Sequence, residues 1–170
     1  MNKISIQYFE TPVGEVRLGS FDGKLCMVDW RCRKMRESID ARLQKGLNAG
    51  YIQEDTVVLQ QARQQLDEYF NRERKTFDVP LLMVGTDFQK QVWRGLIDIP
   101  YGTTCSYLEL SKNIGNDKAV RAVASANGAN AISIMIPCHR IIGSDGSLVG
   151  YAGGLPAKKK LLQLEQALLV

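Results

Sequence analysis

Histidine is nearly absent from this chain, since His139 is the only one among 170 residues. Four cysteines are present, and only Cys26 and Cys32 lie near each other in the sequence. A structural zinc site needs four nitrogen or sulfur ligands, usually in two close pairs, so we expect no bound metal. The irregular cysteine spacing is unlike the disulfide framework of a secreted domain and favours a reducing, cytoplasmic location.

Long apolar runs and a strong charge of one sign are missing as well. No run approaches the roughly 20 apolar residues of a membrane span, and the start of the chain is too polar for a signal peptide, so we expect no membrane contact. The net charge is +4. Residues 1–85 carry 13 Lys and Arg against 12 Asp and Glu, whereas residues 86–170 carry 9 against 6. This mild excess in the second half is a weak indication of a polyanionic partner.

Hydrophobic periodicity predicts a sheet followed by helices in the first half. Alternating residues predict strands at 4–9, 16–21 and 25–30, joined as a small antiparallel meander. Apolar residues at every fourth position predict helices over 35–47 and 58–70.

The helical pattern stops before Pro80, and the domain boundary is expected between Pro80 and Gly85. We therefore expect an α/β domain of residues 1–80 and a second, mostly helical domain of residues 86–170.

The second half predicts two short helices joined by a glycine-containing turn, which is the helix-turn-helix pattern. A further helix precedes this pair, and a closing helix is predicted over 158–169. Each of the first three helices follows residues that can cap it. The expected caps are Thr86 or Asp87, Thr104 or Ser106, and Asn116 or Asp117.

The helix expected over residues 118–126 contains mainly Ala, Val and Ser, and Arg121 is the one long side chain near its middle. A helix that reads the major groove usually presents several Arg, Asn, Gln or Lys side chains. One interpretation is a buried helix packed through its alanines. The other is a helix that approaches the minor groove of DNA closely and inserts Arg121 while reading little sequence.

Cys138 and His139 adjoin in the most apolar part of the chain, residues 132–142. The pattern there indicates a buried strand that should end at Pro137, which lacks a backbone donor. A thiolate is a nucleophile, and a nearby imidazole can take its proton. Neighbours on a strand point to opposite faces, so the pair needs a bend at Pro137 or a bridging water.

Glu165 falls on the apolar stripe of the closing helix. Its carboxylate either reaches solvent from the rim or is buried with a partner, for which His139 is the candidate. In the second case Glu165 would fix the tautomer of His139. Spacing alone leaves open both a catalytic Cys-His-Glu arrangement and a buried, inert cysteine.

Several blocks of the second half, in this order, resemble the O6-alkylguanine-DNA alkyltransferases, also called methylated-DNA–protein-cysteine methyltransferases. A weaker similarity to the variable first domain of the family lies at residues 11–14. The blocks are Phe88–Trp93, Ile99–Gly102, Ser106–Tyr107, Pro137–Arg140 and Gly150–Gly154.

The resemblance implies an α+β protein. Its N-terminal domain would be ribonuclease H-like, with an antiparallel sheet and helices, and its C-terminal domain winged-helix-like with the helix-turn-helix. It implies a cytoplasmic monomer without cofactor that binds alkylated duplex DNA irrespective of sequence and flips the damaged nucleotide out. The alkyl group of O6-alkylguanine, and of O4-alkylthymine, would pass irreversibly to Cys138.

The resemblance also gives matching residues their roles. His139 would deprotonate Cys138 through a water, Glu165 would orient His139, and Tyr107 would rotate the nucleotide and protonate the departing base. Arg121 would fill the gap in the duplex, and Asn130 would tie the helix-turn-helix to the active-site strand. The DNA-binding residues would be Arg121, Ala122, Ser125, Asn130 and Arg140, and the pocket residues Met135, Tyr151, Ala152 and Gly153.

Three positions depart from the common pattern of the family. Ala129 and Ala131 stand where many members have Arg and Pro, and Ala152 stands where some have a serine that meets the guanine oxygen. We expect weaker DNA contact at 129 and only a backbone donor at 152.

Three other functions remain to be weighed. A lesion sensor without repair activity conflicts with the presence of Cys138. A cysteine hydrolase would need an oxyanion hole, which no motif indicates. A transcription regulator would need base-reading side chains on its second helix.

Overall fold

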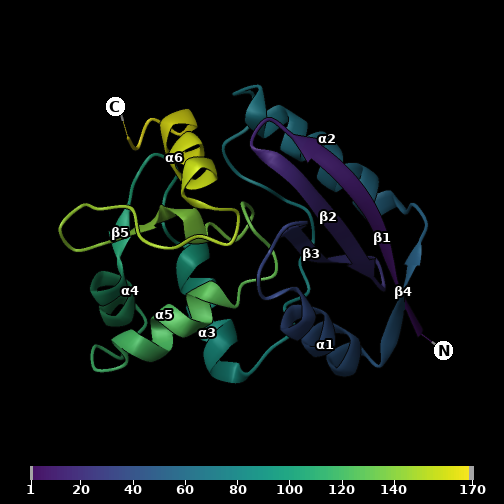
Figure 1. Cartoon of the computed structure of the whole chain (residues 1–170), viewed down its shortest axis with the longest axis horizontal. Helices are drawn as coiled ribbons and strands as arrows, with labels where there is room; N and C mark the ends of the chain where they lie inside the picture. Colours follow the sequence, from purple (N-terminus) through teal and green to yellow (C-terminus); the bar gives the residue numbers. More distant parts are fainter. Residues whose placement is uncertain (1, 169–170) are drawn as a thin grey trace. The chain divides into compact units, whose positions relative to one another are not determined.

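The computed structural model describes residues 2–168, and the chain divides into two compact units, residues 1–85 and 86–170 (Figure 1). Each unit buries one tryptophan, Trp30 in the first and Trp93 in the second. None of the helices in the described part of the chain has the length and apolar composition that crossing a bilayer requires.

The N-terminal unit is built on a four-stranded sheet with the order β3-β2-β1-β4. The first three strands form the predicted antiparallel meander, and the turn between β2 and β3 uses positive φ angles at Asp22 and Gly23. β4 was not predicted, and it pairs in parallel with β1, so the sheet is mixed. The strands are β1 (Asn2–Thr11), β2 (Gly14–Phe21), β3 (Lys24–Trp30) and β4 (Ala49–Gln53).

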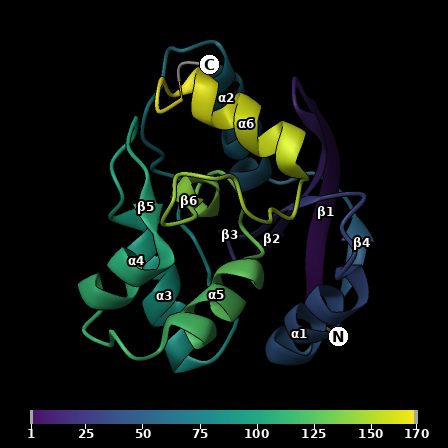
Figure 2. The same cartoon turned by 60° about the vertical axis from the view of Figure 1, so that its left-hand side comes forward.

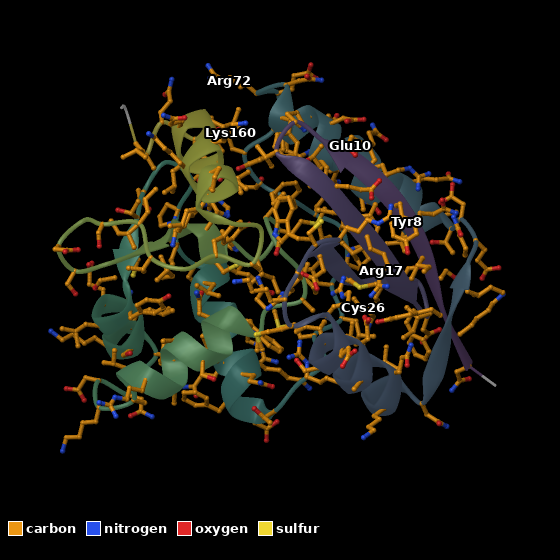
Figure 3. All side chains as sticks on the ribbon, in the orientation of Figure 1. Tyr8, Glu10, Arg17, Cys26, Arg72 and Lys160 are labelled. Atoms are coloured by element: carbon orange, nitrogen blue, oxygen red, sulfur yellow. The ribbon has the colours of Figure 1, made fainter. Side chains whose placement is uncertain are left out.

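Two helices complete this unit, α1 (Arg36–Leu47) and α2 (Val57–Phe70), and both follow the predicted fourfold spacing. Thr56 caps α2 by accepting a hydrogen bond from the backbone N–H of Leu59. Arg17, labelled in Figure 3, lies on β2. It is ion-paired with Asp40 of α1, which fastens that helix to the strand.

The C-terminal unit is mostly helical, as predicted. In two views α3, α4 and α5 lie together on one side of the short β5–β6 pair, and α6 lies on the other side (Figures 1 and 2). The indole N–H of Trp93 donates to the carbonyl of Ala126 at 2.9 Å and ties α3 to α5. The elements are α3 (Asp87–Ile97), β5 (Cys105–Ser106), α4 (Tyr107–Asn113), α5 (Val120–Gly128), the 3₁₀ turn η1 (Cys138–Arg140), β6 (Ile141–Ile142) and α6 (Leu155–Leu164).

Helix starts were predicted with mixed success. Thr86 and Ser106 each form a capping box, with Gln89 and Glu109 as the reciprocal partners. α5 begins after Ala119 without a side-chain cap, so the prediction of Asn116 or Asp117 was wrong. α6 starts at Leu155, three residues before its predicted start, and residue 169 of the predicted range lies outside the described part of the chain.

The strand expected before Pro137 does not exist. Residues 131–136 form tight turns instead, and Ile134 adopts a left-handed backbone with φ of 72°. β-branched residues usually favour strands. Here the side chain of Asn130 makes hydrogen bonds to the backbone of Ile132 and Ile136 that a neighbouring strand would otherwise make.

Candidate active site

Asn130 follows the C-cap residue of α5, Ala129, and its buried side chain organises the segment that leads to Cys138. Its Oδ1 accepts from the backbone N–H of Ile132 at 3.0 Å. Its Nδ2 donates to the carbonyl of Ile136 at 2.9 Å and lies 3.3 Å from both the carbonyl of Ile132 and the Sγ of Cys138. One side chain therefore fixes the end of the helix-turn-helix, the turn and the thiol together.

A tight turn at Pro137 places Cys138 and His139 on η1 rather than on a strand. The N–H of Cys138 donates to the carbonyl of Ile136 at 2.8 Å, and the φ and ψ of Pro137, −81° and 63°, are those of an inverse γ-turn. The alternation of a strand therefore does not separate the two side chains. Cys138 is only 5% exposed and His139 is fully buried.

Glu165 is the buried partner of His139. Its Oε2 lies 2.7 Å from Nε2 of the imidazole, and the residue is 1% exposed. Of the two interpretations of Glu165, the structure has the buried acid with a dedicated partner. The other ring nitrogen of His139, Nδ1, is buried and has no hydrogen-bond partner among residues 2–168.

Arg140, of which a DNA-binding role was expected, is buried and bound to Glu165. It is 5% exposed, its Nε and Nη2 donate to the two carboxylate oxygens of Glu165 at 2.9 and 3.1 Å, and its Nη1 donates to the carbonyl of Ile99 at 2.7 Å. Three of the five N–H donors of the guanidinium are therefore used by buried acceptors. Asn130 is likewise buried, and its side chain binds the turn that stands in place of the expected active-site strand.

The charges of this cluster shift its protonation equilibria. Burial alone would raise the pKa of Glu165, but the hydrogen bonds and charges of His139 and Arg140 outweigh it and lower the pKa to about 2. Burial lowers the pKa of His139, and the charges of Arg140 and Lys158 add to that effect against the opposing Glu165. At neutral pH the site therefore holds an ionised carboxylate beside a neutral imidazole.

Lys158 is a site residue that the sequence reasoning missed. It is fully buried on α6, and its Nζ donates to the carbonyls of Val149 and Gly150 at 2.6 and 3.4 Å, which holds the preceding loop. Burial lowers its pKa to about 8, opposed by the charge of Cys138. The sequence does indicate that Lys158 shares the buried face of Glu165, because it lies seven residues, or two helical turns, before Glu165 on the same apolar stripe.

Tyr107 begins α4 and is half-buried. Burial raises the pKa of its phenol, a hydrogen bond from the side chain of Asn127 lowers it, and the charge of Cys138 raises it. The phenol thus keeps its proton at neutral pH and lies within electrostatic range of the thiol. Asn127 was not predicted, since an asparagine inside an Ala-rich helix carries no distinctive signal.

The exposed face of α5 carries Arg121, Ala122 and Ser125, whereas Val123 and Ala126 point into the core. One face of this helix is therefore packed in the core, as in the first interpretation. The other face is exposed and carries Arg121, as the second interpretation requires. These three exposed residues are not part of the buried cluster of His139, Arg140 and Glu165.

The expected pocket residues have varied surroundings. The ring of Tyr151 packs edge-on against His139, with ring centroids 6.4 Å apart. Met135 is buried, and Ala152 and Gly153 are half-buried in the loop that Lys158 holds. Among residues 2–168 there is no group of three or more His, Cys, Asp or Glu side chains that could hold a metal ion.

Both units of the chain are similar to domains of one known protein family. Residues 4–83 match the family model of the ribonuclease-like domain of 6-O-methylguanine DNA methyltransferase, and residues 87–167 match that of its DNA-binding domain. The methylated-DNA–protein-cysteine methyltransferase of Methanosarcina acetivorans is 44% identical over 158 residues, which cover 92% of this chain and 95% of the relative. The protein of that name from Haemophilus influenzae is 40% identical, over 98% and 88%.

A solved structure also matches the whole chain. The crystal structure of Mycobacterium tuberculosis OGT in complex with DNA has a TM-score of 0.80 and 36% sequence identity, and the match covers 97% of this chain and 93% of that chain.

Replacing Asn130 by Ala is expected to destabilise the C-terminal unit. The change leaves the N–H of Ile132 buried without the side-chain oxygen that it donates to, at a cost of roughly 1–3 kcal/mol, and the carbonyl of Ile136 keeps only the N–H of Cys138 as a donor. Urea unfolding followed by Trp93 fluorescence in a Trp30→Phe background measures this loss. Asn113→Ala, on the exposed end of α4, is the matched control, and equal stabilities for the two variants would contradict the role of Asn130.

Proposed function

Because the chain belongs to the 6-O-methylguanine DNA methyltransferase family, we propose that Cys138 is the cysteine that accepts the alkyl group. The protein binds DNA and repairs it by transferring an alkyl group to one of its own cysteines. The observation that carries the assignment is the position of Cys138 beside the buried His139–Glu165 pair.

The other cysteines are poorer nucleophiles or lack such neighbours. Burial raises the pKa of the Cys26 thiol to about 12, and burial with the charge of Glu109 raises that of Cys105 to about 11. Both remain protonated at neutral pH, and a thiol is far less nucleophilic than a thiolate. Cys32 is exposed and lies in the other unit.

The transfer begins with loss of the Cys138 proton. Nε2 of His139 keeps its proton and donates a hydrogen bond to the ionised Glu165, which leaves the lone pair of Nδ1 to receive the thiol proton through a water. The Nδ2 group of Asn130, 3.3 Å from the sulfur, donates toward the developing thiolate. The imidazolium that forms is stabilised by the carboxylate, so charge separation stays local.

The thiolate then attacks the alkyl carbon of the flipped base. The carbon–sulfur bond forms as the carbon–oxygen bond breaks, and the electron pair of that bond passes to the guanine. Tyr107 supplies a proton to the ring nitrogen of the departing base and recovers one from solvent or from the imidazolium. The same displacement on O4-alkylthymine needs no different side chain, and we include that lesion among the substrates.

DNA is held without sequence specificity in this proposal. The exposed face of α5 presents Arg121 but few side chains that can read base edges, which suits damage that arises in any sequence. Contacts to phosphates would come from the excess Lys and Arg of residues 86–170. We further propose a monomer in a reducing, cytoplasmic compartment, in keeping with four free cysteines.

Intact-mass measurement tests the assignment of Cys138. After mixing with a duplex that carries one O6-methylguanine, the protein is expected to gain the mass of one methyl group in place of a hydrogen, in a one-to-one ratio with repaired DNA. Cys138→Ala should remain unmodified, and the matched control Cys32→Ala should react as the parent does. Methyl transfer to the Cys138→Ala variant, or turnover beyond one equivalent, would overturn the proposal. An O4-methylthymine duplex extends the assay to the second lesion.

Arg121→Ala is expected to slow repair in duplex DNA at least about tenfold and to leave repair of a single-stranded lesion nearly unchanged. Only the duplex has a gap to fill, and unstacking a base costs a few kcal/mol, where 1.4 kcal/mol is a factor of ten. Single-turnover rates on the two substrates give the comparison. Arg94→Ala, exposed on α3, is the control, and equal slowing of Arg121→Ala on both substrates would contradict a gap-filling role.

A further inference from the structure

Arg140 is hydrogen-bonded through several nitrogens within the buried cluster that it forms with His139 and Glu165. Three of its nitrogens donate hydrogen bonds. Two of them donate to the two carboxylate oxygens of Glu165, and the third donates to the carbonyl of Ile99. This fork geometry matches a carboxylate in a way that a lysine cannot reproduce. The reaction proposed above, on which this inference rests, gives Arg140 no task, so its burial needs a separate reason.

The reason lies in the two forms that the His139–Glu165 pair can adopt. With Glu165 ionised, Nε2 of His139 carries the ring proton and Nδ1 keeps its lone pair. If the pair gains a proton, it becomes either an imidazolium beside a carboxylate or a protonated acid beside the other tautomer of the ring. In both products the added proton leaves Nδ1 occupied. Nδ1 can then no longer take the proton of Cys138.

Arg140 opposes that extra proton from the side of Glu165. A carboxylate 1% exposed with only a neutral imidazole as partner would be strongly desolvated and would tend to bind a proton. The guanidinium adds a positive charge and two hydrogen bonds that the ionised carboxylate alone can accept. A buried ion pair of this kind is weak evidence for a stability role, since an apolar replacement is often as stable.

We propose that Arg140 is a positioning residue that keeps Glu165 ionised and thereby holds His139 in the form whose Nδ1 can accept the proton of Cys138. It contacts neither the thiol proton nor the alkyl group and acts through Glu165. Its link to Ile99 anchors the guanidinium, and the ring of Tyr101, 5.7 Å from its central carbon, covers one face.

Other charged and titratable groups face the same cluster. Lys158 from α6 and Cys138 from η1 both interact electrostatically with it, and the phenol-bearing rings of Tyr151 and Tyr101 pack beside His139 and Arg140. Lys158 opposes an imidazolium just as Arg140 does, but it holds the carbonyls of the loop rather than Glu165. Arg140 combines its charge with direct bonds to the carboxylate of Glu165.

His139 makes this testable without any activity assay, because it is the only histidine of the chain. Nitrogen NMR of an untagged chain labelled with ¹⁵N-histidine reports which ring nitrogen carries a proton, free of overlap. The parent protein should show a protonated Nε2 and an unprotonated Nδ1 at neutral pH. In Arg140→Gln, Nδ1 should become protonated at a pH at least about one unit higher, a tenfold change in proton affinity. The low-pH limit of the single-turnover rate should move upward in parallel.

Two further variants complete the experiment. Arg140→Lys keeps the positive charge but not the two-pronged hydrogen bonding. In this variant Nδ1 of His139 should become protonated at a pH between those of the parent and of Arg140→Gln. Arg140→Lys also provides the test if the Gln variant folds poorly. Arg63→Gln removes an arginine from an exposed ion pair with Asp55 and should leave the titration unchanged. Identical Nδ1 titrations in the parent and in folded Arg140→Gln, or in the Lys and Gln variants, would overturn the inference. Failure of the proposed function would appear separately, as a parent protein that takes up no alkyl group.

Discussion

The C-terminal unit depends on keeping one carboxylate ionised in its interior. Glu165 ends α6 with almost no exposure to water, and only hydrogen-bonded partners make such a charge tolerable. Both partners, His139 and Arg140, come from one 3₁₀ turn, so α6 and that turn must meet in a single arrangement. Gly102 approaches the same point with φ of +80°, and a Cβ there would lie 3.2 Å from the Glu165 carbonyl.

In the function proposed above, this constraint separates the chemistry of the buried cluster from the DNA contacts of α5. The buried cluster holds every charge needed to move one proton, whereas the exposed face of α5 offers one long side chain, Arg121. A protein that reacts once has no product to release from its nucleophile and no hydrolytic water to admit. In the proposed reaction, a buried site with one thiol, one base and one carboxylate that orients the base is sufficient for that task.

The sequence predicted the elements better than it predicted the site. Three strands, the helix starts at Thr86 and Ser106 and the helix-turn-helix follow from local patterns. The strand expected before Pro137 failed because the side chain of Asn130 supplies the hydrogen bonds that a neighbouring strand would otherwise make. The family resemblance implied a DNA-binding role for Arg140, and no local pattern indicated that it would be buried beside Glu165. Its acceptors lie 25 and 41 residues away, beyond the range of any local pattern.

The central claim is that ionised Glu165 makes His139 a competent base for Cys138. Single-turnover methyl transfer by Glu165→Gln, with Glu73→Gln as an exposed control, tests it most directly. Losing a positioned acid–base partner removes about 10²- to 10⁴-fold in rate, so the Gln variant should lose at least about 10²-fold while still binding the lesion duplex. A Glu165→Gln protein that folds, binds DNA and transfers the methyl group within a few-fold of the parent rate would contradict the account.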